Sequence, residues 1–462
     1  MNIRRIARWA PVIGLIAGIF ASLSPAAAAA DAGSTPRAKH VIVVGVAGLR
    51  WQDVSTATTP TLARLAEHGS VGTMSARTVP AVACPGEGWL TLGDGSLSAF
   101  RQPKDIPDGD SCAGREPARV EHGREPADPA KDPAPPGRVS DAERLRVLNH
   151  ALQFDAHVGL LGDSVDCVSA VGRGAALAGA DRKGWVDHYL ERLPTDPGAV
   201  LQRCPLTLVS MRPLPEGDRK QRLAQLARLD TALAAIVQHR PANTVLMVAG
   251  VSQTENTRAR LQLALASGPG FSGGWLHSPS TRRVPYVELV DMAPTIMNLL
   301  GDTPEYDPAG QAWRGEAPGR PGSLAGTKAQ LIDIERHALA QKDAQVWYLI
   351  GFGVLCGAVA VPSGVLFFRR RRGLSFSDRA LRIAAVAAVT LSAVPVASSL
   401  ANLVPWWRAG WPLLAAAAVA VAIAGAITAV IYAARLRVGE RHRATVAVVA
   451  VAGVTVAVFV TD

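Results

Sequence analysis

Five cysteines carry the most reactive side chains in this 462-residue sequence. Cys356 lies in a long apolar stretch, where a thiol is a small apolar filler. The other four, Cys84, Cys112, Cys167 and Cys204, precede that stretch. In an oxidising compartment their even number predicts two disulfides. Of the three connectivities we favour nearest neighbours, Cys84–Cys112 and Cys167–Cys204. No C-x-x-C or H-x-x-x-H spacing predicts a structural zinc site, so no metal ligand is assigned.

A second group of residues could bind an anion. Ser280-Thr281-Arg282-Arg283 places two guanidinium groups next to each other, and guanidinium forks match the geometry of phosphate oxygens. A solvated loop explains the same residues and is the interpretation we favour, with Arg282 and Arg283 kept as candidate anion contacts. Asp291 precedes Pro294, and we expect its carboxylate to cap a helix that begins at Pro294 by accepting backbone N–H groups.

Four long apolar stretches occupy the C-terminal part of the chain: Val346–Phe368, Ile383–Val404, Pro412–Ala434 and Ala444–Val460. At about 1.5 Å per residue, roughly 20 helical residues cross the ~30 Å hydrocarbon core of a bilayer. We therefore expect four transmembrane helices. No Asp, Glu, Lys or His lies within these stretches, which argues against an ion or proton pathway.

Arginines between the stretches predict the orientation. The first connection carries Arg369, Arg370, Arg371, Arg372, Arg379 and Arg382, and the third carries Arg435, Arg437, Arg441 and Arg443. The second carries only Arg408. Short loops rich in Lys and Arg stay cytoplasmic, so the region from Ala32 to about Gln345 is expected outside the membrane. Trp406, Trp407 and Trp411 are expected in the outer interfacial belt.

The N-terminus agrees with this orientation. Arg4, Arg5 and Arg8 precede an apolar run and then the small residues Ala28-Ala29-Ala30, which is typical of a cleaved export signal. An uncleaved anchor is the alternative. We divide the chain into a signal at 1–30, an extracytoplasmic domain at 31–344 and a membrane region at 345–462. The expected location is the cell membrane, with the lipid bilayer as a partner.

The net charge of +10 reflects this topology. The signal and membrane regions hold 14 Lys and Arg but three acidic residues, which leaves 34 Lys and Arg against 35 Asp and Glu outside. An external region of nearly neutral charge gives no indication of nucleic-acid binding.

Strand and helix patterns alternate in the external region. Buried strands are predicted at His40–Ala47, Leu206–Met211 and Thr244–Ala249, with further extended segments at Ser70–Met74, His157–Leu161 and Tyr286–Val290. Helices are predicted from Pro60 to Ala66 and at Ala142–Phe154, Arg219–His239 and Pro294–Leu300. This alternation predicts an α/β fold with a mostly parallel sheet flanked by helices. The polar segment Phe100–Val139 is expected to be a mobile surface insertion.

Three segments resemble the alkaline phosphatase superfamily, which includes sulfatases and nucleotide pyrophosphatases. Residues 41–53, VIVVGVAGLRWQD, are similar to the opening strand and turn of these enzymes. Residues 84–95, CPGEGWLTLGDG, are placed like their nucleophile segment ahead of a helix, and residues 284–301, VPYVELVDMAPTIMNLLG, are close to their late strand and helix. The resemblance implies an alkaline-phosphatase-like fold. More narrowly, it resembles the external part of a class of bacterial multi-pass membrane proteins within this superfamily.

The resemblance also implies a chemistry whose ligands are replaced in this sequence. Members of the superfamily transfer phosphoryl or sulfuryl groups with divalent cations held by Asp and His, which neutralise oxyanion charge. Ala47 occupies the first ligand position, and Gly250-Val251-Ser252-Gln253 stands where an Asp-His pair is expected. No cofactor is therefore expected. Zn²⁺ or Ca²⁺ belongs to the alternative, in which side chains such as Asp53, Asp163 or His277 converge near Cys84.

The same comparison places Cys84 at the nucleophile position. Sulfatases have a Cys-x-Pro segment there, whereas Cys84-Pro85-Gly86 lacks that spacing and the arginine that follows it. A disulfide with Cys112 is the interpretation we favour for Cys84. Thr78 and Thr91 are alternative hydroxyl nucleophiles, although Thr91 is equally explained as a helix residue that faces the core.

The sequence therefore favours a membrane-anchored, externally facing α/β domain whose site has lost its metal ligands. A non-catalytic or diverged envelope protein that binds an envelope protein or glycolipid is the leading hypothesis. An active metal-dependent hydrolase or transferase of envelope phosphate or sulfate esters is the alternative. A structural subunit of a larger envelope complex is a third.

Overall fold

A computed structural model describes residues 37–106, 112, 115–122, 134–254, 258–373 and 377–437. The chain forms two compact units, Met1–Lys328 and Ala329–Asp462. The predicted export signal at 1–30 and the fourth apolar stretch, Ala444–Val460, lie outside the described residues.

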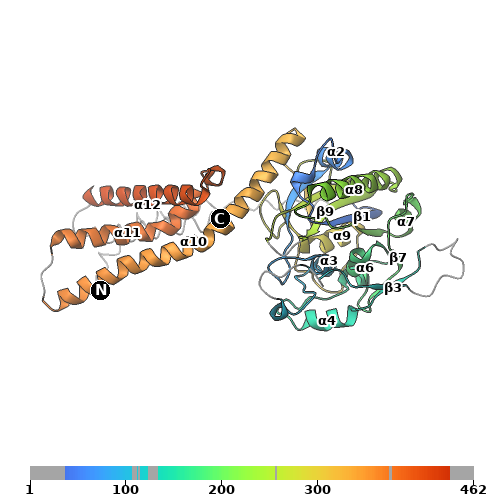
Figure 1. The fold of residues 1–462 in the computed structure, drawn as a ribbon, viewed down its shortest axis with the longest axis horizontal. Coiled ribbons are helices and arrows are strands. Elements are labelled where there is room, and N and C mark those ends of the chain that lie inside the picture. Colours follow the sequence, from blue (N-terminus) through green and yellow to red (C-terminus); the bar gives the residue numbers. More distant parts are fainter. Residues whose placement is uncertain are drawn as a thin grey trace, which may run out of the picture. The chain divides into compact units, whose positions relative to one another are not determined.

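A mixed, mostly parallel sheet of ten strands forms the centre of the first unit (Figure 1). In chain order its strands are β1 (His40–Ala47), β2 (Ser70–Ser75), β5 (Val168–Val171), β7 (His188–Leu190), β8 (Leu206–Ser210), β9 (Thr244–Ser252), β10 (Gln262–Ser267), β11 (Trp275–His277), β12 (Tyr286–Glu288) and β13 (Arg314–Ala317). Their order across the sheet is β13-β11-β2-β10-β9-β1-β8-β5-β7, with β12 paired to β2.

The directions of the strands agree with the predicted class of fold. The pairs of β1 with β8 and β9, of β5 with β7 and β8, and of β2 with β11 and β12 are parallel. Only β10, which pairs with β2 and β9, and β13, which pairs with β11, run antiparallel to their described neighbours. β3 (Val120–His122), β4 (Gly137–Val139) and β6 (Trp185–Val186) form a separate small sheet.

Helices cover both faces of the large sheet (Figure 1). One face carries α2 (Pro60–His68), α7 (Gly198–Arg203) and α8 (Arg219–His239), and the other carries α3 (Pro85–Asp94), α5 (Leu160–Ser164), α6 (Arg173–Gly179) and α9 (Met292–Leu300). The remaining elements of this unit are α4 (Ala142–His150), η2 (Trp51–Asp53), η3 (Pro103–Asp105) and η4 (Leu289–Asp291). Because both faces are covered, the central strands are apolar along their whole length, which is why their sequences are continuous apolar runs.

Helix α3 is buried over its whole length. Two glycines permit this close packing. A Cβ atom on Gly88 would lie 2.3 Å from the carbonyl oxygen of Val251 in β9, and one on Gly174 in α6 would lie 2.3 Å from Nε1 of Trp89 in α3. Real Cβ contacts are never this short, so these positions admit only glycine while α3 keeps its place against the sheet and α6.

Three sequence expectations need correction. His157–Leu161 was expected to be extended, but Gly159 turns the chain at φ 97° and α5 begins at Leu160. His157 stacks on Tyr306 with ring centroids 3.9 Å apart. A short apolar run does not separate strand from helix. Helix α4 ends at His150, before the predicted Phe154, and α9 begins at Met292, before the predicted Pro294.

A fourth correction concerns the predicted surface insertion, Phe100–Val139. Its described residues include Phe100, Arg115 and Ala118, which are all buried. A surface position is therefore wrong for these residues. The prediction was based on the small number of large apolar side chains in this segment. Composition does not show that Arg115, a charged residue within it, is paired with a buried carboxylate.

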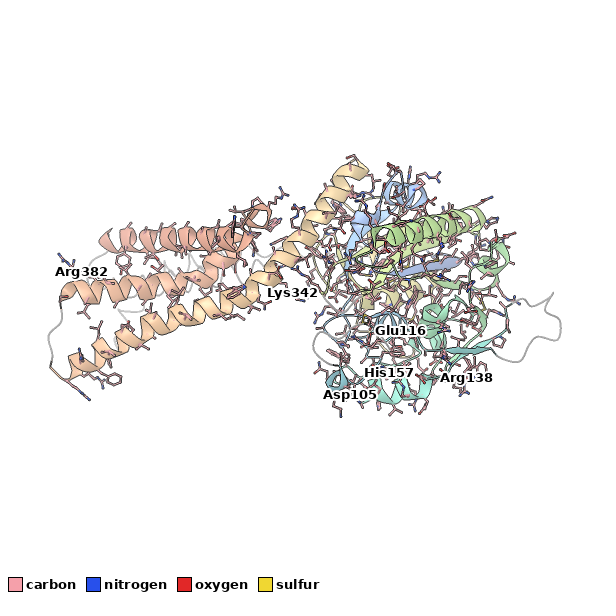
Figure 2. The ribbon with its side chains drawn as sticks, viewed as in Figure 1. Asp105, Glu116, Arg138, His157, Lys342 and Arg382 are labelled. Carbon is pink, nitrogen blue, oxygen red and sulfur yellow. A yellow bond between two sulfur atoms is a disulfide. The ribbon has the colours of Figure 1, made fainter. Side chains whose placement is uncertain are left out.

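The second unit contains the helices that are long and apolar enough to cross a membrane. Helix α10 (Leu324–Arg371), which begins just before this unit, is followed by α11 (Asp378–Ala401), η5 (Trp406–Arg408) and α12 (Pro412–Arg437). Three candidate spans lie within them, at Leu324–Arg369, Arg379–Ala401 and Pro412–Ala433. Arg382 projects from the first turns of α11, within the predicted cytoplasmic arginine cluster (Figure 2).

The loop between α11 and α12 is tied to α10 within this unit. Nε and Nη2 of Arg408 donate to the two carboxylate oxygens of Asp333 at 2.9 and 2.7 Å, and the Trp407 indole donates to the same carboxylate at 3.3 Å. Trp406 is 5% exposed and donates to Asn402. Trp411 is exposed, whereas Trp406 is packed within this unit because this loop folds back on its own helices.

Candidate functional site

The positions that the sequence singled out do meet at one edge of the sheet. Ala47 ends β1 and pairs with Ser252, which ends the neighbouring parallel strand β9. The Gly48 N–H donates to the Ser252 carbonyl at 2.8 Å, and the Gln253 N–H donates to the Ala83 carbonyl at 2.9 Å. The carboxyl ends of β1 and β9 therefore lie beside the segment that leads into α3, and this group forms the candidate site.

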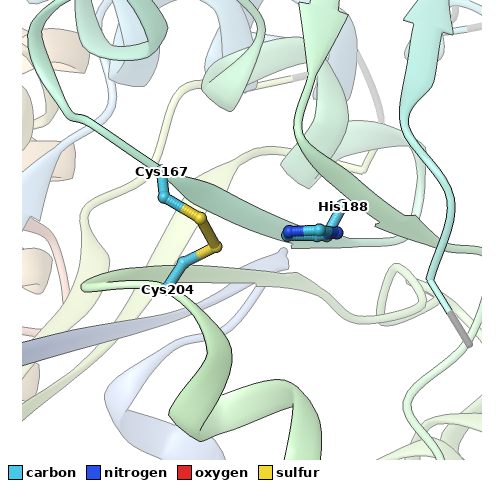
Figure 3. A group of neighbouring side chains, drawn as sticks. All are labelled: Cys167, His188 and Cys204. Carbon is cyan, nitrogen blue, oxygen red and sulfur yellow. A yellow bond between two sulfur atoms is a disulfide. The ribbon is translucent and has the colours of Figure 1, made fainter. Parts of the chain in front are cut away.

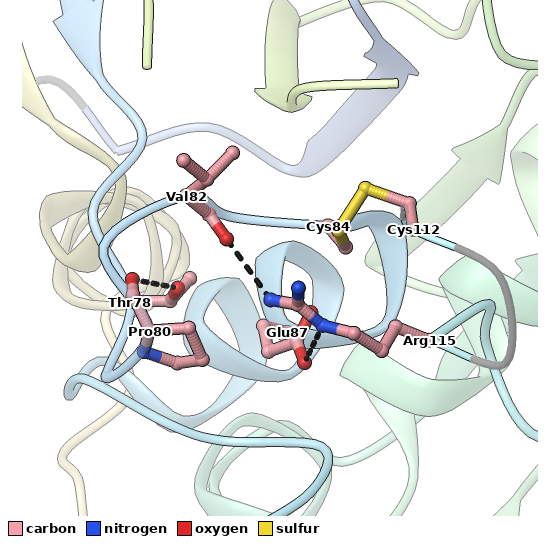
Figure 4. The surroundings of a disulfide bond; sticks show 7 residues. All are labelled: Thr78, Pro80, Val82, Cys84, Glu87, Cys112 and Arg115. Carbon is pink, nitrogen blue, oxygen red and sulfur yellow. Dashed lines mark hydrogen bonds and ion pairs between the residues drawn. A yellow bond between two sulfur atoms is a disulfide. The ribbon is translucent and has the colours of Figure 1, made fainter. Parts of the chain in front are cut away.

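Cys84 is the N-cap residue of α3 and is bonded to Cys112 (Figure 4). The second disulfide joins Cys167 to Cys204, so both bonds have the connectivity favoured from the sequence. A sulfur atom in a disulfide is not a thiolate, and the thiolate is the nucleophilic form of cysteine. Cys84 therefore has no nucleophilic sulfur while this bond is intact.

A buried ion pair that the sequence did not indicate lies beside this disulfide (Figure 4). Nε of Arg115 donates to Oε1 of Glu87, in the first turn of α3, at 2.8 Å, and Nη2 donates to the Val82 carbonyl at 3.0 Å. Both side chains are fully shielded from solvent. The only sequence signal was the position of Glu87 three residues after the N-cap of a helix, where a carboxylate is favourable.

Burial dominates the electrostatics of this pair. It raises the pKa of Glu87 above its ordinary value, against the opposing effects of the Arg115 hydrogen bond and charge and of the Cys84 and Glu87 backbone N–H groups. Glu87 Oε2 and Arg115 Nη1 are buried and have no hydrogen-bond partner among the described residues. The pair therefore places two opposite charges in a buried position beside the N-terminus of α3. The hydrogen-bonding capacity of these two charged groups is only partly satisfied.

The two candidate hydroxyl nucleophiles are both engaged. Thr78 is buried and its Oγ1 donates to the Pro80 carbonyl at 3.0 Å (Figure 4). Thr91 is fully buried in α3, where its Oγ1 accepts from the Ser98 N–H at 3.1 Å. Each hydroxyl thus has a local structural partner, and Thr91 faces the core as the alternative interpretation expected.

Two of the three side chains that could have converged as metal ligands, Asp53 and Asp163, are paired with arginines instead. Nε and Nη2 of Arg222 donate to the Asp53 carboxylate at 2.8 and 2.6 Å, and Asp163 pairs with Arg182 at 3.1 Å. Burial and the charge of Arg314 lower the pKa of His277. Within the part of the chain that the structure describes, the one group of three or more His, Cys, Asp or Glu side chains with metal-compatible spacing is Cys167, His188 and Cys204, which lies elsewhere.

The loop that contains the candidate anion contacts is anchored through Asp291. Arg282 and Arg283 are exposed, and Arg282 has a positive φ of 52°. The Asp291 carboxylate is buried and accepts from the Ser280 hydroxyl at 2.6 Å and from the Glu288 and Gln311 N–H groups, each at 2.9 Å. The predicted role as a cap of α9 is therefore wrong: Asp291 is the N-cap residue of α9, but its carboxylate binds neighbouring loops.

No family model and no curated protein matches this chain. Members of the alkaline phosphatase superfamily are among the solved structures that match it, over about 60% of its length, as the three sequence segments predict. One is a superfamily protein from Vibrio parahaemolyticus, at 12% identity and a TM-score of 0.32, covering 58% of this chain and 68% of that chain.

Two others are similar in extent. The alkaline phosphatase of the Antarctic bacterium TAB5 matches at 10% identity and a TM-score of 0.35, covering 58% of this chain and 99% of its own. The lipoteichoic acid synthase LtaP from Listeria monocytogenes matches at 11% identity and a TM-score of 0.32, covering 60% of this chain and 74% of its own. At these identities and TM-scores the likeness carries no argument about the chemistry of this chain.

Proposed function

We propose that this protein is a membrane-anchored envelope protein with a non-catalytic extracytoplasmic domain of alkaline-phosphatase type, which binds an envelope protein or glycolipid. The observation that carries the proposal is the state of Cys84. The residue at the nucleophile position of the resemblance is held in a disulfide, and the first turn of the helix behind it is occupied by the Glu87–Arg115 ion pair.

The residues at the ligand positions support the same proposal. Phosphoryl and sulfuryl transfer bring negatively charged groups together, and a bound cation normally offsets this charge. Ala47 offers a methyl group there, and Ser252, its partner across the two strands, offers a fully buried hydroxyl. Hard divalent cations require several oxygen ligands, and zinc requires nitrogen, sulfur or carboxylate ligands. A methyl group and one hydroxyl do not meet either requirement.

The disulfides and the arginine clusters support the extracytoplasmic placement. Disulfides persist in oxidising compartments outside the cytoplasm. The first loop between apolar helices carries an arginine cluster, whereas the described loop between α11 and α12 carries only Arg408, which is paired with Asp333. Short arginine-rich loops stay cytoplasmic, which leaves the α/β unit on the other side.

Catalysis is tested with the full-length protein in lipid nanodiscs. Turnover of aryl phosphate, phosphodiester and sulfate esters is measured with and without Zn²⁺, Ca²⁺ and Mg²⁺, together with the metal content of the protein. We expect no turnover above a heat-denatured control. Metal-dependent turnover would contradict the proposal and favour the hydrolase or transferase alternative.

Two variants then identify the origin of any turnover. Cys84→Ala and Cys112→Ala each remove the same disulfide, so they share its structural cost, but only Cys112→Ala leaves the Cys84 thiol free. Turnover that survives in Cys112→Ala and is lost in Cys84→Ala would assign Cys84 as a nucleophile. Equal rates in the two variants would exclude that role.

A further inference from the structure

The second disulfide, Cys167–Cys204, has surroundings that a structural disulfide does not need. Cys167 directly precedes β5 and Cys204 precedes β8 by two residues, so the bond lies at the amino ends of these parallel strands, opposite to the candidate site. One ring nitrogen of His188 and the two sulfur atoms all lie within 4.8 Å of one another. Figure 3 shows the His188 ring with its edge directed toward the disulfide.

The hydrogen bonds of His188 fix its tautomer. Arg203 Nε, which can only donate, lies 3.2 Å from His188 Nε2, so Nε2 must be an acceptor. The carbonyl of Ala134, which can only accept, lies 2.9 Å from Nδ1, so Nδ1 carries the proton. The proton is therefore on Nδ1, where a backbone carbonyl binds it, and the Nε2 lone pair accepts from Arg203. This is the tautomer in which a histidine can bind a metal through Nε2.

A buried polar row adjoins this group. Ser169 in β5 is in register with His188 in β7 on one side and with Thr207 in β8 on the other. Ser169 and Thr207 are each 1% exposed, and neither hydroxyl has a hydrogen-bond partner among the described residues. Buried hydroxyls of this kind call for a water or an ion.

A small cavity adjoins the same residues. It has a volume of about 20 Å³ and is lined by Ser169, His188 and Arg203 together with apolar side chains. This is enough for one water molecule, which needs roughly 10–15 Å³. His188 thus belongs both to the group with the two sulfur atoms and to the lining of a cavity with room for one water molecule.

We propose that Cys167, Cys204 and His188 form a redox-gated zinc site, closed as a disulfide and able to bind Zn²⁺ when the two cysteines are reduced. Two thiolates and one imidazole are a soft donor set that selects zinc among the common divalent cations, with a fourth position left for water. At zinc–ligand bonds of about 2.0–2.3 Å, ligand atoms in a tetrahedral site lie roughly 3.5–4 Å apart. The two sulfur atoms, which are bonded to each other in the disulfide, must therefore move apart on reduction to hold the metal.

The chemistry of the switch is balanced by a dithiol donor. One donor thiolate attacks a sulfur of the disulfide, and the second donor thiol resolves the mixed disulfide. The donor leaves as a disulfide, and its two electrons and two protons yield the Cys167 and Cys204 thiols. Zn²⁺ then replaces the two thiol protons, which pass to water, and takes the place of Arg203 Nε at His188 Nε2. Cys167 and His188 are half-buried, so reductant and metal have a route to the group.

The test uses the full-length protein in nanodiscs, with zinc uptake measured by mass spectrometry of the desalted protein. Cobalt is used as a second probe, because thiolate ligation gives Co²⁺ an intense charge-transfer absorption. A Cys84→Ser/Cys112→Ser background leaves Cys167 and Cys204 as the only external thiols, and the unsubstituted chain is measured alongside. Each sample is compared oxidised and after reduction with a phosphine that is then removed under nitrogen.

We expect no bound zinc in the oxidised chain and one zinc per chain after reduction, with thiolate absorption in the cobalt form. His188→Ala should weaken zinc binding at least about tenfold, and Cys167→Ser/Cys204→Ser should abolish it. The proposal fails if the reduced chain takes up no zinc, or if uptake is unchanged in His188→Ala or in the double serine variant. It also fails if reduction unfolds the α/β unit and zinc does not restore its circular dichroism, because binding to a built site stabilises the fold.

Discussion

The two disulfides of this protein lie at opposite edges of one sheet and differ in their neighbours. Cys84–Cys112, at the carboxyl edge, lies beside the buried Glu87–Arg115 pair. Cys167–Cys204, at the amino edge, lies beside a half-buried imidazole, a small cavity and two hydroxyls that have no hydrogen-bond partner among the described residues. The same covalent bond therefore has different surroundings at the two edges, and our two proposals rest on those surroundings.

The largest effect on stability is expected at the carboxyl edge, beside Cys84–Cys112. Arg115→Met leaves the Glu87 carboxylate buried without its partner, which should lower the free energy of unfolding of the α/β unit by about 3–5 kcal/mol. Chemical denaturation followed by tryptophan fluorescence measures this. The double variant Glu87→Leu/Arg115→Met should be less destabilised than Arg115→Met, because it leaves no isolated charge.

An exposed pair provides the control for this prediction. Arg146 and Glu143 form an ion pair on the surface of α4, and Arg146→Met should leave the unfolding midpoint nearly unchanged. If Arg115→Met lowered the unfolding midpoint as little as Arg146→Met, the Glu87–Arg115 pair would not stabilise the carboxyl edge.

The two disulfides themselves should contribute similar stability when no metal is present. They close loops of 28 and 37 residues, for which chain entropy predicts about 3–4 kcal/mol each. Cys84→Ser/Cys112→Ser and Cys167→Ser/Cys204→Ser should therefore have similar unfolding free energies in denaturant titrations. Zinc should separate the two bonds: it should stabilise the reduced chain only while Cys167, Cys204 and His188 are present. Equal stabilisation of both serine variants by zinc would remove the distinction between the two edges.

A carboxyl group at the C-terminal end of α3 should make the stability of the α/β unit depend on pH. Asp94 is buried and accepts from Ser98 Oγ and the Gly159 N–H, and burial raises its pKa to about 8. In the unfolded chain it ionises near its ordinary pKa. Below the ordinary pKa, Asp94 is protonated in both the folded and the unfolded chain, and its contribution to stability is fully present. As pH rises from there toward 8, only the unfolded chain loses this proton, so the contribution is lost.

Stability should therefore fall by about 1.4 kcal/mol per pH unit between roughly pH 4 and 8, or about 2–3 kcal/mol from pH 6 to pH 8. Asp94→Asn keeps the shape of the side chain but does not titrate, so it should flatten this part of the profile. Denaturation midpoints measured at several pH values test this. An unchanged slope in Asp94→Asn would mean that the pH dependence arises from another group, such as Glu87, whose pKa is also raised.

The smallest effect on stability is expected at the amino edge, beside Cys167–Cys204. The hydroxyls of Ser169 and Thr207 are buried and have no hydrogen-bond partner among the described residues, so Ser169→Ala and Thr207→Val should change the stability of the oxidised chain by less than about 1 kcal/mol. The same denaturation assay measures this. Losses well above that value would show that these hydroxyls are already satisfied in the oxidised protein, and would weaken the case for an ion beside them.

Much of the fold was predictable because burial on both faces makes the signal continuous. The runs at β1, β8 and β9 are apolar at successive positions, and α8 spans Arg219–His239 as its spacing predicts. The strand β10, which is six residues long, was not predicted. Helix α5 was predicted as a strand because one short apolar run fits both periods.

The candidate site divides in the same way. The residues at Ala47 and Ser252 predict that the expected metal ligands are replaced, and this stays a prediction. The even cysteine count predicted two disulfides, and the structure has the pairing that we favoured. The partner of Glu87 was not predictable, because Arg115 lies 28 positions away in a polar segment with the composition of a surface loop.

The sequence alone determined the apolar spans and the alternation of strands and helices, because both depend on residue type and short-range spacing. Only the tertiary structure decided which charged side chain is buried beside Cys84 and that His188, Ser169 and Thr207 share one row next to Cys167 and Cys204. Parallel strands bring residues together at an edge in an order set by the sheet, and that order is not the order of the chain.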